Sequence, residues 1–167
     1  MRMLDKLLQG VEVRSLVGDG TVAVGRLEFD SRKVVPGTLF FATRGTQADG
    51  HAYIPAAVAA GAAAVVCEEL PAERPVGVTF VQVPDSTVAL GQVASAFYGH
   101  PSRRLKLVGV TGTNGKTTTA TLLYRMFRRL GYKAGLISTV VYCVDDREIP
   151  STHTTPDSIR LNAMMAE

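Results

Sequence analysis

Residues 109–117 read GVTGTNGKT and nearly match the phosphate-binding pattern G-x-x-x-x-G-K-[ST]. Counting back from Gly115 puts Val110 where the pattern requires its first glycine, and Gly109 comes one position early. The apolar run LKLVGV precedes the loop, and TTTATLLYRMFRRLG after it carries apolar residues at helical spacing. A strand, a glycine loop, a helix and a returning strand in KAGLISTVVYCV predict the first unit of a mononucleotide-binding (P-loop) domain with a parallel sheet.

The loop satisfies the mechanical requirements of a phosphate site despite its displaced spacing. Gly112 and Gly115 can adopt positive φ and turn backbone N–H groups toward an anion, and the helix N-terminus adds its dipole. Lys116 can reach the β and γ phosphates of a nucleotide, and the Thr117 hydroxyl can bind Mg²⁺. A tight turn with a chance lysine does not account for the glycine pair and Gly-Lys-Thr occurring together. Nucleotide phosphates are therefore expected at Gly112, Thr113, Asn114, Gly115, Lys116, Thr117 and Thr118.

The first hundred residues alternate strand-like and helix-like segments, which predicts a small N-terminal α/β domain over residues 1–100. Strands are expected in VEVRSLV, GRLEFD, the segment 38–42, AAAVVC and VTFVQVP. Helices are expected in YIPAAVAA, closed by Gly61, and after the N-cap pair Asp85-Ser86.

The sequence His100-Pro101-Ser102 interrupts this pattern and marks the expected domain boundary. The second domain, residues 101–167, is expected to continue past KAGLISTVVYCV with an edge strand in DDREIP and a helix from Pro156-Asp157. A parallel nucleotide-binding sheet needs further βα units to cover both of its faces. We therefore expect the chain to be the front part of a longer protein.

Composition excludes several classes of protein. Hydrophobic residues make up 46% of the 167 residues and charged residues 20%, which is typical of a folded globular chain. The net charge is only +3, with no tryptophan and no dense basic stripe, so no nucleic-acid partner is expected. No stretch approaches the roughly 18 apolar residues of a membrane span, and the N-terminus lacks a signal-peptide core. Cys67 and Cys143 lie in apolar runs as expected for buried thiols, so we predict a cytoplasmic protein without membrane insertion.

Three segments, in order and across nearly the whole chain, resemble the Mur ligases. GTNGKT at 112–117 looks like the phosphate loop that this family shares with folylpolyglutamate synthetases, so the displaced glycine is expected of the family. DSRKVVPGTLFFATRGTQADGHAYIPAAVAAGAAAVV, from Asp30, is similar to the N-terminal domain of the ligases that add the third and the last peptide units of the cell-wall precursor. STHTTPD at 151–157 resembles the third-residue ligases, the MurE type.

The resemblance implies an ATP-dependent, ADP-forming amide ligase of peptidoglycan precursor synthesis. Its substrate would be UDP-N-acetylmuramoyl-L-alanyl-D-glutamate, here called the UDP-muramoyl dipeptide. ATP would phosphorylate the D-glutamate side-chain carboxylate, and a diamino acid, meso-diaminopimelate or lysine, would attack the acyl phosphate. Lys116 and Mg²⁺ on Thr117 would supply positive charge between the two anions, which gives Lys116 a catalytic role. The resemblance implies UDP-sugar binding by residues 1–100 and ATP binding by residues 101–167, and we expect a monomer.

The resemblance also implies contacts with the uridine nucleotide. Phe29 and Ser31 of FDSR would face it, as would Thr46, Gln47 and Ala48 of GTQADG. A hydroxyl and backbone amides in a glycine-flanked turn suit such a ligand. Thr46 stands where some relatives have His, so a backbone contact is the expectation at that position.

The muramoyl peptide would lie against the second motif of the resemblance. Thr154 and Thr155 match the paired threonines of the family, although a helix cap ahead of Pro156 is a compatible alternative. His153 stands where some relatives have Asn. A hydrogen bond from His153 to substrate is expected there, and general-base catalysis is not.

Other functions remain open. The sibling ligase that adds D-alanyl-D-alanine has a similar DSR and PG-LF-A front end, but the TTPD segment argues against it. A non-catalytic module would bind ATP or a UDP sugar as a sensor, and a generic P-loop switch would have no affinity for UDP-muramoyl peptides. Because the remaining metal ligands, the carbamylated lysine and the amino-acid-binding domain of the family would follow Glu167, this chain alone is expected to lack ligase activity.

Overall fold

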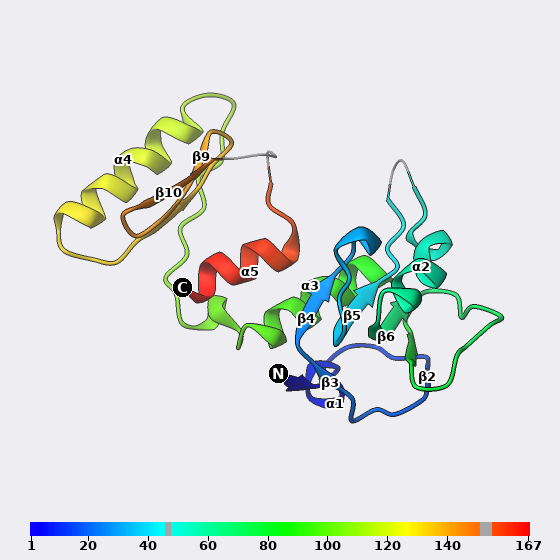
Figure 1. Cartoon of the computed structure of the whole chain (residues 1–167). Coiled ribbons are helices and arrows are strands. Elements are labelled where there is room, and N and C mark those ends of the chain that lie inside the picture. Colours follow the sequence, from blue (N-terminus) through cyan, green and yellow to red (C-terminus); the bar gives the residue numbers. More distant parts are fainter. Residues whose placement is uncertain (46–47, 151–154) are drawn as a thin grey trace. The chain divides into compact units, whose positions relative to one another are not determined.

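The computed structural model describes residues 1–45, 48–150 and 155–167. Within these residues the chain forms two compact units, Met1–Gly99 and His100–Glu167 (Figure 1). No helix in the described ranges is both long enough and apolar enough to cross a membrane.

The first unit contains a mixed sheet built from short apolar strands. Its strands, in spatial order, are β2 (Ser15–Val17), β7 (Thr79–Gln82), β6 (Ala62–Cys67), β5 (Thr38–Phe41) and β4 (Arg26–Glu28). β4, β5, β6 and β7 run parallel to one another, and β2 is antiparallel to β7. A ribbon of β1 (Arg2–Met3) and β3 (Ala23–Val24) belongs to the same unit. The α/β class predicted for this unit is confirmed, and its sheet is mostly parallel.

Helices cover this sheet. Phe40, Val65 and Phe80 are paired across β5, β6 and β7 and are fully buried in one cluster with residues of α2 (Ile54–Ala59). Alternate side chains of the same strands point to the opposite face. The longer helix α3 (Ser86–Phe97) contacts β5 and β6 without contributing to the α2 cluster, and the short helix α1 (Leu4–Leu7) contacts α3.

Turn and cap residues set the helix ends as the sequence predicts. Pro55 lies in the first turn of α2, and Gly61, with φ 95°, follows its C-terminus. Asp85 caps α3 by accepting hydrogen bonds from two N–H groups of the first turn, both at 2.8 Å. The strand expected in VEVRSLV is shorter than predicted, because residues 15–17 alone pair with β7.

The second unit begins with a 3₁₀ turn, η3 (Pro101–Arg103), and contains α4 (Lys116–Arg129), β8 (Gly135–Ile137), β9 (Val141–Val144), β10 (Arg147–Pro150) and α5 (Ser158–Ala166). The edge strand expected in DDREIP and the helix expected after Asp157 are both present. The single strand expected in KAGLISTVVYCV is instead β8 and β9. Ser138 makes the turn between them, since its hydroxyl donates to the carbonyl oxygen of Val141 at 2.8 Å and accepts from the Val141 N–H at 3.2 Å.

The parallel sheet predicted for the second unit is wrong for the described residues, because β8, β9 and β10 pair antiparallel. The strand predicted in LKLVGV, residues 105–110, is also wrong: this segment is outside every described strand, and Leu107 and Val108 are 65% and 67% exposed. A strand forms only where its N–H and C=O groups find a neighbouring strand. No strand of the described residues pairs with this segment.

Replacing Asp85 by alanine is expected to lower the free energy of unfolding by about 1 kcal/mol, because two N–H groups of α3 lose their acceptor. Urea denaturation followed by far-ultraviolet circular dichroism measures the change. Asp85→Asn is the matched control, since asparagine also caps, and it should stay within about 0.5 kcal/mol of the parent. Equal losses in the two variants would contradict the capping role.

Candidate nucleotide and substrate sites

The glycines of the loop before α4 differ in their backbone φ angle. Gly115, next to the helix, has φ 77°, and Gly112 has φ 151°, both in the region that favours glycine. Gly109 is not among the positive-φ residues. A Cβ at Gly115 or at Gly109 would meet no heavy atom within 4 Å, so conformation rather than space distinguishes the two positions. This difference agrees with the prediction that Gly112 and Gly115 shape the loop.

Lys116 folds back over this loop. Its Nζ donates hydrogen bonds to the carbonyl oxygen of Gly112 and, at 3.2 Å, to that of Thr113. The side chain is exposed, so the ammonium group is held at the loop and remains open to solvent. Because hydrogen bonds between two charged groups are stronger than those to neutral carbonyls, an arriving anion can displace these partners.

The N-terminus of α4 is open, unlike those of α3 and α5. No described side chain caps α4, whereas Asp157 caps α5 through the N–H of Arg160 at 2.8 Å. The Thr119 N–H bonds to the Gly115 carbonyl at 2.9 Å, so the N–H groups of residues 116–118 belong to the unpaired first turn. Such groups, together with the helix dipole, favour an anion. The half-buried Thr117 and the exposed Thr118 lie in this turn.

Polar contacts hold α4 against the strands of its unit. Arg128 pairs with Asp145 and, at 2.6 Å, with Asp146, both in the turn between β9 and β10. These contacts raise the pKa of Arg128, mainly through the hydrogen bond to Asp146. The Tyr124 hydroxyl donates to the Asp145 carbonyl, and Arg128 donates to the Tyr132 carbonyl at 3.0 Å. The axis of α4, and with it the open N-terminus, is therefore fixed relative to the sheet of the second unit.

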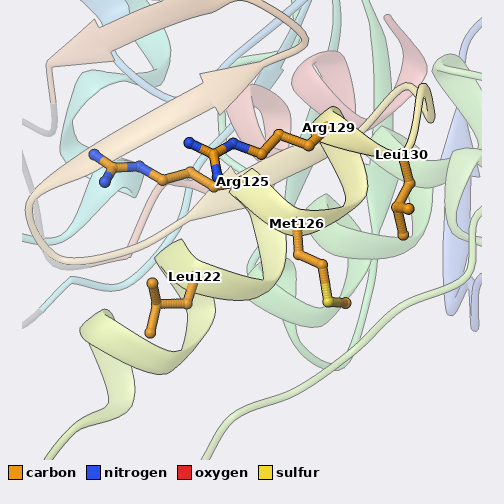
Figure 2. Close-up of a pocket in the computed structure, with 5 residues that line it drawn as sticks. All are labelled: Leu122, Arg125, Met126, Arg129 and Leu130. Carbon is orange, nitrogen blue, oxygen red and sulfur yellow. The ribbon is translucent and has the colours of Figure 1, made fainter.

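A shallow hollow on α4 is distinct from the loop. Figure 2 shows its lining residues, Leu122, Arg125, Met126, Arg129 and Leu130. The side chains of Met126 and Leu130 point the same way, and the two arginines extend in another direction. Leu122 and Leu130 are 60% and 64% exposed. The apolar spacing that predicts this helix therefore marks an exposed face, because α4 has no buried residue.

In the first unit, the residues predicted to contact the uridine nucleotide lie in loops that leave the sheet at one edge. Phe29 and Ser31 directly follow β4, and Ala48 lies in the loop after β5. β4 and β5 are paired and parallel, so both loops leave at the carboxyl edge, where α/β sheets bind ligands. Phe29 and Ala48 are exposed and Ser31 is half-buried. Thr46 and Gln47 lie outside the described residues.

Asp30 shapes the turn that carries Ser31. Its carboxylate accepts from the Arg32 N–H at 3.1 Å and pairs with the Arg32 guanidinium at 2.8 Å. Hydrogen bonding from the Arg32 side chain lowers the pKa of Asp30 to about 2, so the carboxylate is ionised at neutral pH. Asp30 caps the 3₁₀ turn η1 (Ser31–Lys33), and Ser31 is thus oriented by local contacts next to Phe29.

The predicted contacts with the muramoyl peptide fall mostly outside the described residues, which exclude His153 and Thr154. Thr155 is described and exposed, and it precedes the buried Pro156. Asp157 caps α5, so helix capping does not account for Thr155.

Few of the described side chains are candidates for binding a metal ion or for thiol chemistry. Across residues 1–45, 48–150 and 155–167, no group of three or more His, Cys, Asp or Glu side chains could hold a metal ion. Thr117 fits a different kind of site, because Mg²⁺ takes most of its ligands from phosphates and water when it binds with a nucleotide. Cys67 and Cys143 are buried free thiols, as predicted. Burial raises the pKa of Cys67 to about 11, so it remains protonated and unreactive.

Several polar residues beside the loop after β5 were not predicted. Arg44 and Asp49 flank the loop, and His51 and Glu68 contact one another close to it. The available signal was the pair of charged residues on either side of GTQA, followed by Gly50 and His51.

Two family models match successive parts of the chain. The model described as "Mur ligase family, catalytic domain" matches residues 24–98, and the model described as "Mur ligase middle domain" matches residues 110–167. The chain belongs to the Mur ligase family.

Two curated relatives carry the name UDP-N-acetylmuramoyl-L-alanyl-D-glutamate--2,6-diaminopimelate ligase. The protein of Bacteroides thetaiotaomicron is 52% identical over 99% of this chain and 34% of its own length. That of Bacteroides fragilis is 56% identical over 97% of this chain and 33% of its own length. A solved structure of a ligase of this name has the same fold, with a TM-score of 0.72 at 22% identity over 99% of this chain and 33% of its own. The chain thus spans about a third of the length of these relatives.

Gly115→Ala is expected to lower the free energy of unfolding of the second unit by about 1 kcal/mol, because alanine is strained at φ 77°. Gly109→Ala is the matched control, since it adds the same methyl group in open space without positive φ. Its free energy of unfolding should be unchanged or slightly higher. Chemical denaturation of both variants measures the difference. A loss as large in Gly109→Ala would show that the positive φ of Gly115 is not the cause.

Proposed function

We propose that the full-length protein is an ADP-forming ligase that uses ATP to join 2,6-diaminopimelate to the UDP-muramoyl dipeptide. The names of the relatives at 52% and 56% identity support this substrate pair. The single observation that carries the ATP-dependent step is the open N-terminus of α4 with Lys116 folded over its loop. Lysine is the alternative amine donor.

The proposed reaction has two steps. An oxygen of the D-glutamate side-chain carboxylate attacks the γ phosphorus of ATP, the bond to the β-phosphate oxygen breaks, and ADP leaves. The amine of the diamino acid then attacks the acyl carbon and loses a proton, and inorganic phosphate leaves as the amide forms. Because two anions must approach each other in the first step, positive charge has to be held in line with them.

Lys116 is the proposed catalytic residue of this chain. Its ammonium group would leave the carbonyl oxygens of Gly112 and Thr113 for the β and γ phosphates of ATP. The backbone N–H groups of the loop and first turn, residues 112–118, would bind phosphate oxygens. Mg²⁺, with the Thr117 hydroxyl as a ligand, supplies further positive charge when it is bound.

Phe29, Ser31, Thr46, Gln47 and Ala48 are the proposed contacts with the uridine nucleotide. Their support is the shared carboxyl edge from which the loops after β4 and β5 leave the sheet. The proposed contacts with the muramoyl peptide are His153, Thr154 and Thr155. We further propose a monomer that works in the cytoplasm, where thiols such as Cys67 and Cys143 stay reduced.

Lys116→Ala is expected to weaken ATP binding by this chain at least about tenfold, because a charge-assisted contact with the phosphates is lost. Isothermal titration calorimetry with ATP and Mg²⁺ measures the affinity. Lys133→Ala removes the same charge from an exposed position beyond α4 and should leave the affinity unchanged. Unaltered ATP affinity in Lys116→Ala would overturn the proposed role of this lysine.

The full-length protein is expected to release ADP only when the UDP-muramoyl dipeptide and 2,6-diaminopimelate are both present. A coupled ADP assay, run in parallel with lysine as the amine, identifies the diamino acid. Dependence on the UDP-muramoyl tripeptide and D-alanyl-D-alanine would identify the sibling ligase instead. Absence of ADP release with every substrate pair would favour a non-catalytic binding module.

A further inference from the structure

A histidine outside the predicted site joins two loops at the carboxyl edge of the first sheet. The Nε2 atom of His51 accepts a hydrogen bond from the Glu68 N–H at 2.9 Å. Since Nε2 is the acceptor, the ring proton lies on Nδ1, which donates to the Asp49 carboxylate at 2.6 Å. The His51 side chain is only 15% exposed. It therefore connects the loop after β5 to the turn after β6.

Arg44 connects the same two segments from the other stem of the loop. Its Nε lies 3.3 Å from the Glu68 carboxylate and 3.7 Å from that of Asp49, and its guanidinium also pairs with Glu69. Glu68 in turn accepts hydrogen bonds from the hydroxyl and the N–H of Ser86, at the start of α3. The loop stems are thus connected through Glu68 to the end of β6 and to α3.

Backbone contacts close the stems of the loop. The Gly50 N–H donates to the Thr43 carbonyl at 2.9 Å, and the Gly45 N–H donates to the Ala48 carbonyl at 2.9 Å. A Cβ at Gly50 would lie 2.6 Å from the Thr43 oxygen, so only glycine permits this approach. Asp49 accepts from the His51 N–H at 2.9 Å, and this bond, followed by the ring contact, lowers the pKa of Asp49. The carboxylate that receives the His51 ring therefore remains ionised.

We infer that Arg44, Asp49, His51 and Glu68 form a latch that holds Ala48 and the loop stems in the position that receives the uridine nucleotide. The latch residues are positioning residues, because they act on the ligand through the loop. This inference rests on the proposed function for its ligand. The latch itself rests only on contacts among the described residues of the first unit.

A first test needs no ligand. Long-range ¹⁵N–¹H spectra of the 167-residue chain at mildly alkaline pH should show His51 as the Nδ1–H tautomer. In His51→Ala, the amides of Gly45, Gly50 and Glu68 should exchange about tenfold faster, while that of Val65 in β6 is unchanged. His51→Gln supplies a new acceptor for the Glu68 N–H and should restore part of the protection. An Nε2–H tautomer, or unchanged exchange at Gly50 in His51→Ala, would overturn the latch.

A second test measures what the latch does for binding. Calorimetry with the UDP-muramoyl dipeptide should show about tenfold weaker affinity in Arg44→Ala and His51→Ala, with partial recovery in His51→Gln. Arg74→Ala removes the same charge from another exposed position of this unit and should bind like the parent. ATP affinity should be unchanged in all four variants, because the candidate phosphate loop lies in the second unit. Unchanged exchange at Val65 in His51→Ala shows that the first unit remains folded.

The two tests distinguish a failure of the latch from a failure of the proposed function. A parent chain that does not bind the dipeptide would overturn the proposed uridine site and the link between the latch and a ligand, whatever the exchange data show. A parent that binds, together with full affinity in His51→Ala or an equal loss in Arg74→Ala, would overturn the latch while leaving the proposed function intact.

Discussion

Parallel pairing of β4, β5, β6 and β7 is the constraint on which the first unit depends, because each parallel neighbour requires a crossover that returns the chain to the opposite edge. The row Phe40, Val65 and Phe80 fixes the register, since a slip of one residue would move these side chains to the other face. With the register fixed, the segments that start at Phe29 and Glu68 leave at the same carboxyl edge. Core packing thus decides which loops can share a ligand.

In the second unit, the choice of residue before each helix has an electrostatic consequence. Asp157 places a carboxylate at the start of α5, which accepts from the Arg160 N–H and offsets the positive end of the helix dipole. Gly115 at the same place before α4 does neither. The cost of an uncapped helix is of the order of 1 kcal/mol, and it leaves the first turn available to a phosphate. An open N-terminus thus favours anion binding and lowers the stability of the helix. The contacts of Arg128 with Asp145 and Asp146 offset this loss by holding α4 to the turn between β9 and β10.

Local patterns predicted most of the elements, and non-local contacts account for the failures. The cap at Asp85 depends on neighbours in sequence, so it could be predicted. The strand predicted in AAAVVC forms because it finds partner strands on both sides, β5 and β7. The strand expected over 105–110 depends on a partner strand, which apolar composition alone cannot reveal. The glycines of the loop could be sorted from spacing, but the contact of His51 with Glu68 could not, because 17 positions separate these residues and pairing of the strands brings them together. The candidate phosphate loop was therefore more predictable than the support of the candidate uridine loop.

In the proposed reaction the two units have different roles: the second unit stabilises charge, and the first unit positions the substrate. A carboxylate and a phosphate oxygen held about 4 Å apart repel by about 4 kcal/mol at an effective dielectric constant of 20. Lys116 can offset a repulsion of this size only if its ammonium group is held near both anions, and its contacts with the carbonyls of Gly112 and Thr113 keep it at the loop beforehand. The uridine end of the substrate is far from the reacting carboxylate in the covalent structure, so its binding energy can be used to position that carboxylate. A firmly held loop in the first unit would then contribute to the rate as well as to the affinity, although it touches no reacting atom.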